Sequence, residues 1–477
     1  MDMALIITPF AAALIAALLP SNRWRPWLTP AAGLVHFILA LRAVFGTAPR
    51  TGGEWVGFDP AGKLVLLLVS TLFMVTSISL IGYLKSHPRR ANRVFVACML
   101  CTLGSMTMVA WSRHLGLMWV AIEATALCTA PLIYFNKTTR SIEATWKYLL
   151  IGFVGIALAL LGTFFLAYSM LHAELKASLV MDDLLRAAPH LSKPWLHVAF
   201  VLMLVGYGTK MGLAPMHTWK PDAYGAAPGA VGTLLSGGVT GCAFLCLLRI
   251  YQICCAADEF AFVSPMLVFM GLFSMAVAGV FMVGQQDYKR MLAYSSVEHM
   301  GILVLGLGFG PAALFGPLLH LFSNGLTKVV LFLSAASINR AYDSTRIDVA
   351  HGVLRRLPVS GGLFLAGFLA ITGSPPFGPF ISEFSILNAG FGTGHFVAGG
   401  LFLFFLLVVF IGMGSTVLPM LQGREAEPAA PSMHRDSFWT VAPPLVLLGA
   451  VLMIGLWIPV PLNDLLHSAV EFLEVQP

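Results

Sequence analysis

Four ionisable residues lie inside long apolar stretches of the chain: Glu123, Lys210, Lys328 and Glu383. A charged side chain near the centre of a bilayer costs about 2.5–3.5 kcal/mol to insert, and it usually faces the protein interior along a path for ions or protons. Four such residues together cost about 10 kcal/mol. Apolar residues would serve stability better, so this pattern indicates proton or ion transfer.

A second set of polar residues has the spacing of one helical face. His320, Asn324 and Lys328 follow one another at intervals of four residues, which places them on one side of a helix. Imidazole both gives and takes a proton near neutral pH. With water between its members, this ladder can form a lateral proton wire that ends at Glu383, with His299 as a further relay or support. The alternative for each histidine is a hydrogen-bonded core residue.

Glu123 and Lys210 form an expected pair. Glu123 lies about 12 Å into its apolar stretch at the rise of an α-helix, where a carboxylate needs a partner or must stay neutral. Lys210 is the natural partner. The titration of such a pair belongs to both groups, so it can act as an electrostatic switch. The alternative is a purely structural ion pair.

The composition is that of a membrane protein. Of 477 residues, 58% are hydrophobic and only 10% are charged, and the mean hydropathy is +0.84. Soluble domains are about half apolar. The net charge of +6 comes from basic residues in short loops, which excludes a nucleic-acid-binding patch. The first 20 residues lack the features of a cleavable signal and are expected to form a first span.

Apolar stretches of about 20 residues predict an all-α polytopic protein with fourteen transmembrane helices. The spans are expected near residues 3–20, 28–46, 62–84, 93–111, 115–135, 143–170, 196–219, 228–252, 262–284, 290–310, 313–338, 360–391, 395–422 and 437–459. Prolines interrupt two of them. Pro215 breaks the seventh span, and Pro375, Pro376 and Pro379 break the twelfth. Broken backbone at membrane depth is tolerated only where protein or water bonds the freed groups.

The two broken spans occupy corresponding positions in two units of five spans, 93–252 and 262–422. Such a pairing is typical of inverted repeats in transporters, and an odd number of spans per unit requires the second unit to be inverted. We expect residues 1–92 to form three preceding helices, and residues 437–477 to form the fourteenth helix and a short tail.

Lys220 follows the break in the seventh span and is expected to line an entry region or the headgroup zone. Most of the 28 Lys and Arg residues fall in loops that follow odd-numbered spans, among them Arg25, Lys220 and Lys289, whereas Arg249 is assigned to the opposite side. The positive-inside rule therefore predicts a multi-pass protein of a bacterial or archaeal cytoplasmic membrane, with both termini on the outer side.

The sequence contains no pattern for an active site of its own. Cys98 and Cys101 have the C-x-x-C spacing of redox or metal sites, but no second pair or histidine is near them in the sequence, so we expect structural thiols. A nucleotide-binding loop, a haem motif, an Fe–S cysteine set and a metal cluster are all lacking in the sequence. No cofactor, metal or catalytic residue is predicted.

Several strings resemble the antiporter-like subunits of complex I, of multisubunit cation/proton antiporters and of energy-converting hydrogenases. They are Glu123 in its span and residues 210–224 (KMGLAPMHTWKPDAY), 287–301 (DYKRMLAYSSVEHMG), 348–358 (DVAHGVLRRLP) and 373–384 (GSPPFGPFISEF). The last two are most similar to the F-type membrane component of hydrogenase-4. The resemblance covers roughly spans 3–13, and it implies fourteen helices, inverted five-helix units and proton translocation driven by a redox module elsewhere in a complex.

The resemblance also assigns roles residue by residue. The family's glutamate and lysine of spans 5 and 7 match Glu123 and Lys210, its lysine and histidine of span 11 match Lys328 and His320, and its terminal residue of span 12 matches Glu383. The chain departs from the pattern where span 8 often carries a lysine or histidine, because Ser236 stands in this span. Asn324 replaces a second span-11 histidine. The two changes predict either transfer through water at those positions or weak pumping through this subunit.

The leading hypothesis is a non-catalytic, proton-translocating subunit of an oxidoreductase complex. Its partners would be other membrane subunits, protons and a cytoplasmic hydrogenase-like module with Fe–S proteins, with no nucleic acid. The first alternative is a sodium/proton antiporter subunit. The alternative from another class is a membrane scaffold that anchors a peripheral enzyme.

Overall fold

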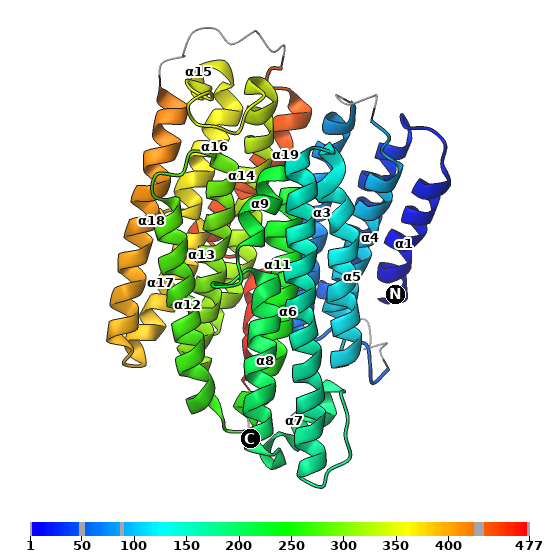
Figure 1. The fold of residues 1–477 in the computed structure, drawn as a ribbon, viewed down its shortest axis with the longest axis vertical. Coiled ribbons are helices and arrows are strands. Elements are labelled where there is room, and N and C mark those ends of the chain that lie inside the picture. Colours follow the sequence, from blue (N-terminus) through cyan, green and yellow to red (C-terminus); the bar gives the residue numbers. More distant parts are fainter. Residues whose placement is uncertain (1, 47–52, 86–89, 424–433, 475–477) are drawn as a thin grey trace.

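The computed structural model describes residues 2–46, 53–85, 90–423 and 434–474. These residues form a bundle of helices (Figure 1), with three isolated β-bridges as the only extended pairings among them. Eleven helices in the described ranges are long and apolar enough to cross a membrane, and Asp2–Leu18 and Pro358–Ile371 are shorter apolar helices. The prediction of an all-α polytopic protein is confirmed.

The helices follow the chain in three groups. The first comprises α1 (Asp2–Leu18), α2 (Leu28–Phe45) and α3 (Pro60–Lys85). The second comprises α4 (Arg93–Trp111), α5 (Leu115–Ile133), α6 (Thr139–His172), α7 (Met181–Ala187), α8 (Lys193–Met211), α9 (Trp219–Ala226), α10 (Gly229–Thr233), the π-helical turn η4 (Leu234–Val239) and α11 (Thr240–Ala256). The third comprises α12 (Phe260–Met282), α13 (Tyr288–Gly308), α14 (Phe315–Tyr342), α15 (Val353–Arg356), α16 (Pro358–Ile371), α17 (Gly378–Gly392), α18 (Phe396–Gln422), α19 (Phe438–Leu456) and α20 (Val460–Leu473).

Burial separates central helices from peripheral ones. The most apolar windows of α11 and α13 are buried completely and that of α14 almost completely, whereas α12, α18 and α19 bury only about a third of theirs. A helix that is buried on every side belongs to the centre of a bundle, while one with an exposed apolar face can meet lipid. The central helices α13 and α14 carry the histidines and lysine singled out by the sequence.

The first break separates α8 from α9 and contains Pro215. Gly212 ends α8 with a left-handed φ of +78°, a conformation that glycine adopts at little cost. The amide of the following Leu213 donates to the carbonyl of Gly208 (2.8 Å). The indole of Trp219 bonds a second carbonyl of this last turn (2.9 Å). The freed backbone groups are therefore bonded by protein, as membrane depth requires.

The second break separates α16 from α17. The helix before it ends in the same way as α8. Gly373 has a φ of +66°, and the amide of Ser374 donates to the carbonyl of Leu369 (3.0 Å). Pro375 and Pro376 lie in the break and Pro379 lies in the first turn of α17.

Four basic residues that were expected in loops are buried: Arg25, Lys220, Lys289 and Arg249. Lys289 donates to the carbonyl of Ala227 (2.7 Å), so it bonds backbone next to α9. Arg249 forms an ion pair with Asp59 (2.5 Å). These placements correct the expectation, which rested on the position of each residue near the end of an apolar stretch.

The segment expected to be a short tail forms α20, which packs against α3. The amide of Gln252 donates to the carbonyl of Phe472 (2.6 Å), and the Arg249 guanidinium lies 5.9 Å from the centroid of the Phe472 ring. The buried ion pair and the end of α20 therefore share one polar region at the end of α11.

We predict that Asp59→Asn destabilises the protein by about 3–5 kcal/mol, the cost of leaving one partner of a buried ion pair without its counter-charge. The amide retains an oxygen that can accept the hydrogen bond from Gly62 (2.8 Å), so the start of α3 keeps its cap. Thermal unfolding of the purified protein in detergent measures the loss.

Two controls isolate the charge. The double variant Asp59→Asn/Arg249→Met should recover most of the loss, because the uncompensated charge is then gone. Asp348→Asn removes a partner of the exposed Arg346 ion pair and should leave stability nearly unchanged. Equal effects of Asp59→Asn and Asp348→Asn would contradict the argument.

Candidate functional site

The helix α13 holds two buried lysines that come from other elements. The Lys328 ammonium, from α14, donates to Ser295 Oγ (2.8 Å) and to the carbonyl of Leu292 (3.3 Å). The Lys220 ammonium, from α9, donates to the carbonyl of Ser296 (3.1 Å). Both lysine side chains are fully buried. Two lysine side chains thus bind α13 within about one turn of each other, and the charge of Lys328 acts on Lys220.

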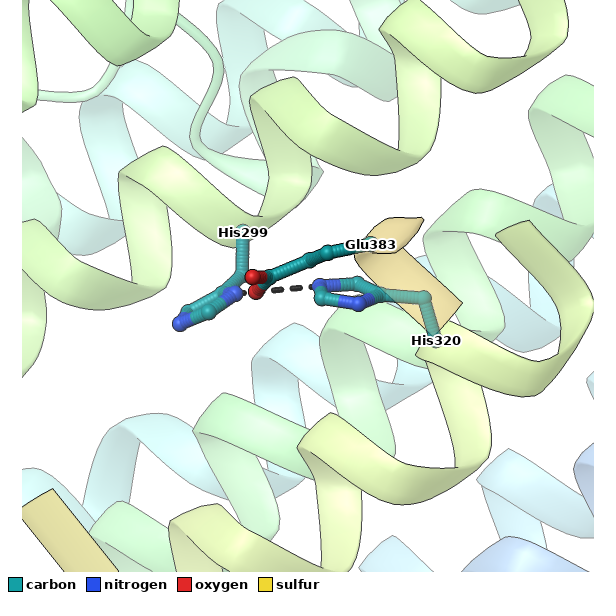
Figure 2. Close-up of side chains that lie close together, drawn as sticks. All are labelled: His299, His320 and Glu383. Carbon is teal, nitrogen blue, oxygen red and sulfur yellow. Dashed lines mark hydrogen bonds between the residues drawn. The ribbon is translucent and has the colours of Figure 1, made fainter. Parts of the chain in front are cut away.

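Further along α13, His299 meets His320 and Glu383 (Figure 2). The Nδ1 atom of His299 lies 3.0 Å from Nε2 of His320, and Nδ1 of His320 lies 2.8 Å from the hydroxyl of Ser382. One ligand atom from each of His299, His320 and Glu383 lies within 4.8 Å of the others. The structure therefore brings three of the predicted residues into one buried group.

The hydrogen bonds fix where the protons sit when both rings are neutral. The Ser382 hydroxyl donates to the carbonyl of Pro379 (2.8 Å), so its oxygen accepts from Nδ1–H of His320. Nε2 of His320 then carries no proton and accepts from Nδ1–H of His299. Nε2 of His299 makes no direct hydrogen bond to another side chain of the described residues, and the backbone of Ile371 interacts with the same ring. This Nε2 atom lies 4.0 Å from an oxygen of Glu298, which makes it the open position for an arriving proton.

Glu298 was not recognised from the sequence as part of this group. It is buried, and its Oε2 atom has no hydrogen bond. The charge of Lys328 acts on the Glu298 carboxyl. A carboxylate can therefore stand between the lysine and the histidine pair. Its position directly before His299 in an apolar span was the available signal.

Glu383 adjoins both the histidine pair and a cleft at the side of the bundle. Its Oε1 atom is buried without a hydrogen bond, and the residue lines a cleft of about 320 Å³ bordered by α17 and α18. Gly373 allows the close approach, because a Cβ atom there would collide with the Glu383 carboxylate. The second helix break thus shapes the space that Glu383 occupies.

Lys210 and Glu123 do not form the expected ion pair. The Lys210 ammonium instead lies 3.4 Å from the hydroxyl of Tyr148 and 5.2 Å from the centre of its ring, and the same hydroxyl lies 2.7 Å from that of Thr129. Lys210 still exerts an electrostatic effect on Glu123, whose Oε2 atom has no hydrogen bond. The aromatic residue between the helices could not be paired with Lys210 from sequence spacing.

Lys220 lies deeper in the bundle than its sequence position predicts. It was expected to line an entrance or the headgroup zone, yet it is fully buried and is held against Gly212, where a Cβ atom would lie 2.5 Å from its side chain. Its neighbour two residues on, Asp222, forms ion pairs with Lys147 (2.8 Å) and Arg290 (3.3 Å) at the partly exposed end of α9. A charged surface group therefore adjoins a buried cation.

Two residues that were expected to take part in proton transfer, Ser236 and Asn324, have no direct hydrogen bond to the buried charged residues. Ser236 is buried in η4, where its hydroxyl bonds the carbonyl of Thr233 (3.4 Å). Asn324 is buried on α14 between His320 and Lys328, and its Oδ1 atom has no hydrogen-bond partner. Neither side chain bridges the charged groups of the described residues by a direct hydrogen bond.

Comparisons with known proteins agree on one family. Residues 112–413 match the family model described as NADH:quinone oxidoreductase/Mrp antiporter, transmembrane. The chain is 32% identical over 439 residues to a hydrogenase-4 component F homolog of Methylacidiphilum infernorum, covering 90% of this chain and 91% of the relative. It is 33% identical over 352 residues to NADH-quinone oxidoreductase subunit N of Desulforudis audaxviator, covering 72% and 68%.

Solved structures show the same fold. A chain of an archaeal membrane-bound sulfane sulfur reductase superposes with a TM-score of 0.87 at 21% identity, covering 99% of this chain and 97% of that one. A chain of respiratory complex I from Thermus thermophilus gives 0.78 at 26% identity, covering 98% and 99%. A chain of the Mrp complex from Dietzia gives 0.83 at 19% identity, covering 99% and 97%.

The resemblance inferred from the sequence strings is therefore confirmed over most of the chain. The match of the family model to more than half of the chain, together with the hydrogenase-4 relative, shows that this chain belongs to the NADH:quinone oxidoreductase/Mrp antiporter family of membrane subunits.

Proposed function

We propose that the chain is a proton-translocating membrane subunit of an energy-converting hydrogenase or a related complex I-like redox complex. The observation that carries the proposal is the buried series Lys220, Lys328, Glu298, His299 and His320, which is gathered around α13. Buried ionisable residues in a membrane bundle are expensive and mark proton paths. The family relationship supports the same function.

We propose a path that starts at the charged end of α9, around Asp222, and reaches the buried ammonium of Lys220. Lys220 and Lys328 cannot both be charged without mutual repulsion in this interior. A proton on one therefore disfavours a proton on the other, which favours onward transfer. The path continues through Glu298 to the histidine pair and leaves at Glu383, beside the cleft of α17 and α18.

Lys220 supplies an ionisable group between the two five-helix units. The sequence has no such group at the position of Ser236. Lys210, with Tyr148 and Glu123, would form the input side of the first half, where a change of charge on Lys210 alters the field on Glu123. Water at Ser236 and Asn324, whose polar atoms are buried, would complete the transfer steps that direct bonds do not span. Each proton moved against 100 mV costs about 2.3 kcal/mol, which the redox reaction must supply.

We propose the arrangement of the repeats and the number of spans from the similarity of the two helix breaks. Gly212 and Gly373 both end a half-helix in the left-handed region, and the next residue bonds five residues back in each case. This likeness supports inverted units over 93–252 and 262–422, flanked by 1–92 and 437–477. Counting each broken helix as one span gives fourteen. With the basic loops in the cytoplasm, both termini would lie on the outer side of a prokaryotic inner membrane.

The proposed partners are other membrane subunits and a cytoplasmic redox module with Fe–S proteins, of the hydrogenase type. Mass spectrometry of the tagged complex, purified in mild detergent, tests this assignment. Recovery of a hydrogenase-like large subunit with Fe–S proteins would support it. Recovery of antiporter-like subunits without a redox protein would favour a sodium/proton antiporter, and a lone partner without redox centres would favour a scaffold.

We predict that Glu383→Gln slows redox-driven proton uptake by the reconstituted complex at least about tenfold, as expected when a positioned proton-transfer group is lost. Uptake is measured with a pH-sensitive dye in sodium-free liposomes and again with sodium. The exposed carboxylate of Glu471 provides the matched control Glu471→Gln, which should leave uptake unchanged. Undiminished uptake in Glu383→Gln would exclude the exit assignment, and uptake that requires sodium would favour the antiporter.

We also predict that Lys220→Met reduces proton uptake at least about tenfold, because methionine preserves an unbranched side chain but cannot hold a proton. Thermal unfolding should show that the variant is folded. Lys176→Met, at an exposed residue, is the control. Equal uptake in both variants would show that Lys220 is a structural residue.

A further inference from the structure

The His299–His320–Glu383 group (Figure 2) has the composition of a transition-metal site. We propose that these three residues bind a divalent transition-metal ion, with Zn²⁺ as the preferred ion, and that the bound ion blocks proton transfer. The binding follows from the geometry alone. The block rests on the proposed function, because it assumes that the same groups carry protons.

The distances suit an ion between the rings. Nδ1 of His299 and Nε2 of His320 face each other at 3.0 Å. Zinc lies about 2.0–2.1 Å from imidazole nitrogen and about 2.0–2.2 Å from carboxylate oxygen. An ion at these bond lengths lies about 1.4 Å off the line between the two nitrogens, with an N–Zn–N angle of about 95°. The rings must therefore move apart by about 0.3–0.4 Å to give the tetrahedral angle. The Glu383 oxygen within 4.8 Å of these atoms becomes the third ligand after a small side-chain rotation.

The surroundings already orient two of the ligands. Metal-binding histidines usually donate their other ring N–H to a nearby acceptor, which fixes the tautomer. His320 does so, because its Nδ1–H donates to Ser382 (2.8 Å) while Nε2 faces the site. Glu383 contributes an oxygen that is buried without a hydrogen bond, so binding an ion would satisfy it.

His299 needs only a change of tautomer. Its proton moves from Nδ1 to Nε2, where it faces the Glu298 oxygen at 4.0 Å. This change of tautomer releases no proton, whereas the buried Glu383 carboxyl gives up its proton when it binds the ion as a carboxylate. Two neutral imidazoles and one carboxylate leave one positive charge on the zinc complex, and the Glu298 carboxylate can balance it. A buried complex of low net charge avoids much of the cost of burying a bare cation.

The cleft of about 320 Å³ beside Glu383 lies between α17 and α18, and Thr372 and Glu383 are its polar lining residues. Three protein ligands leave a fourth position of the tetrahedron open for water. An ion bound there would occupy both imidazole nitrogens of the relay. The histidine pair could then neither accept a proton nor pass one on to Glu383.

Binding is tested without reference to transport. The purified protein in detergent is titrated with Co²⁺, whose visible absorption reports tetrahedral coordination, and Zn²⁺ is then added to displace it. The wild type should show a stoichiometric spectrum that Zn²⁺ abolishes. His320→Gln and Glu383→Gln should each weaken binding at least tenfold, whereas His467→Gln, at an exposed histidine, should not. Absence of the spectrum, or its retention in both site variants, would overturn the proposal.

A second measurement guards against misfolded variants. Zn²⁺ should raise the thermal unfolding temperature of the wild type and of His467→Gln, because an ion that binds only the folded state stabilises it. It should leave that of His299→Gln much less changed. Equal stabilisation of all three would place the ion elsewhere and overturn the site.

The block is tested on the reconstituted complex. Zn²⁺ at concentrations that saturate the Co²⁺ site should stop proton uptake, and a chelator should restore it. Binding with unimpaired uptake would overturn the block while leaving the proposed function intact. Absence of uptake before zinc is added would contradict the proposed function, whereas the Co²⁺ titration would still decide the site.

Discussion

The structure depends on how the bundle accommodates charge in an apolar interior. Each buried ionisable group must find a hydrogen bond, a counter-charge or a neutral form, since an isolated ion in this environment is very costly. Lys220 and Lys328 use carbonyl and hydroxyl oxygens of α13, and Arg249 uses Asp59. A helix buried on all sides can supply such bonds, which explains why α13 is the element that other charged side chains approach.

The two broken helices follow from the same constraint. Each break begins at a glycine with a left-handed backbone conformation. The backbone groups that the break frees are bonded by protein. Each break also places a glycine against a functional side chain, with Gly212 next to Lys220 and Gly373 next to Glu383. The breaks therefore do more than interrupt hydrophobic segments. They let a charged group approach the backbone at a depth where continuous helix would exclude it.

Sequence reasoning predicted what depends on local composition and spacing. The all-helical fold, the position of both breaks and the shared face of His320 and Lys328 follow from apolar length, prolines and helical periodicity. It failed where three-dimensional packing decides. Lys220 and Arg249 were assigned to loops because they lie near the ends of apolar stretches. The contact of Lys210 with Tyr148 joins two helices, and no spacing within either helix reveals it.

The central claim is that Glu298 links the lysines to the histidine pair in a working proton path. The most direct measurement is redox-driven proton uptake by the reconstituted complex carrying Glu298→Gln, in sodium-free liposomes, beside the wild type. The substitution keeps the size of the side chain and removes its ability to hold an exchangeable carboxyl proton. The account predicts that the complex assembles and that uptake falls at least about tenfold. Uptake at the wild-type rate would contradict it.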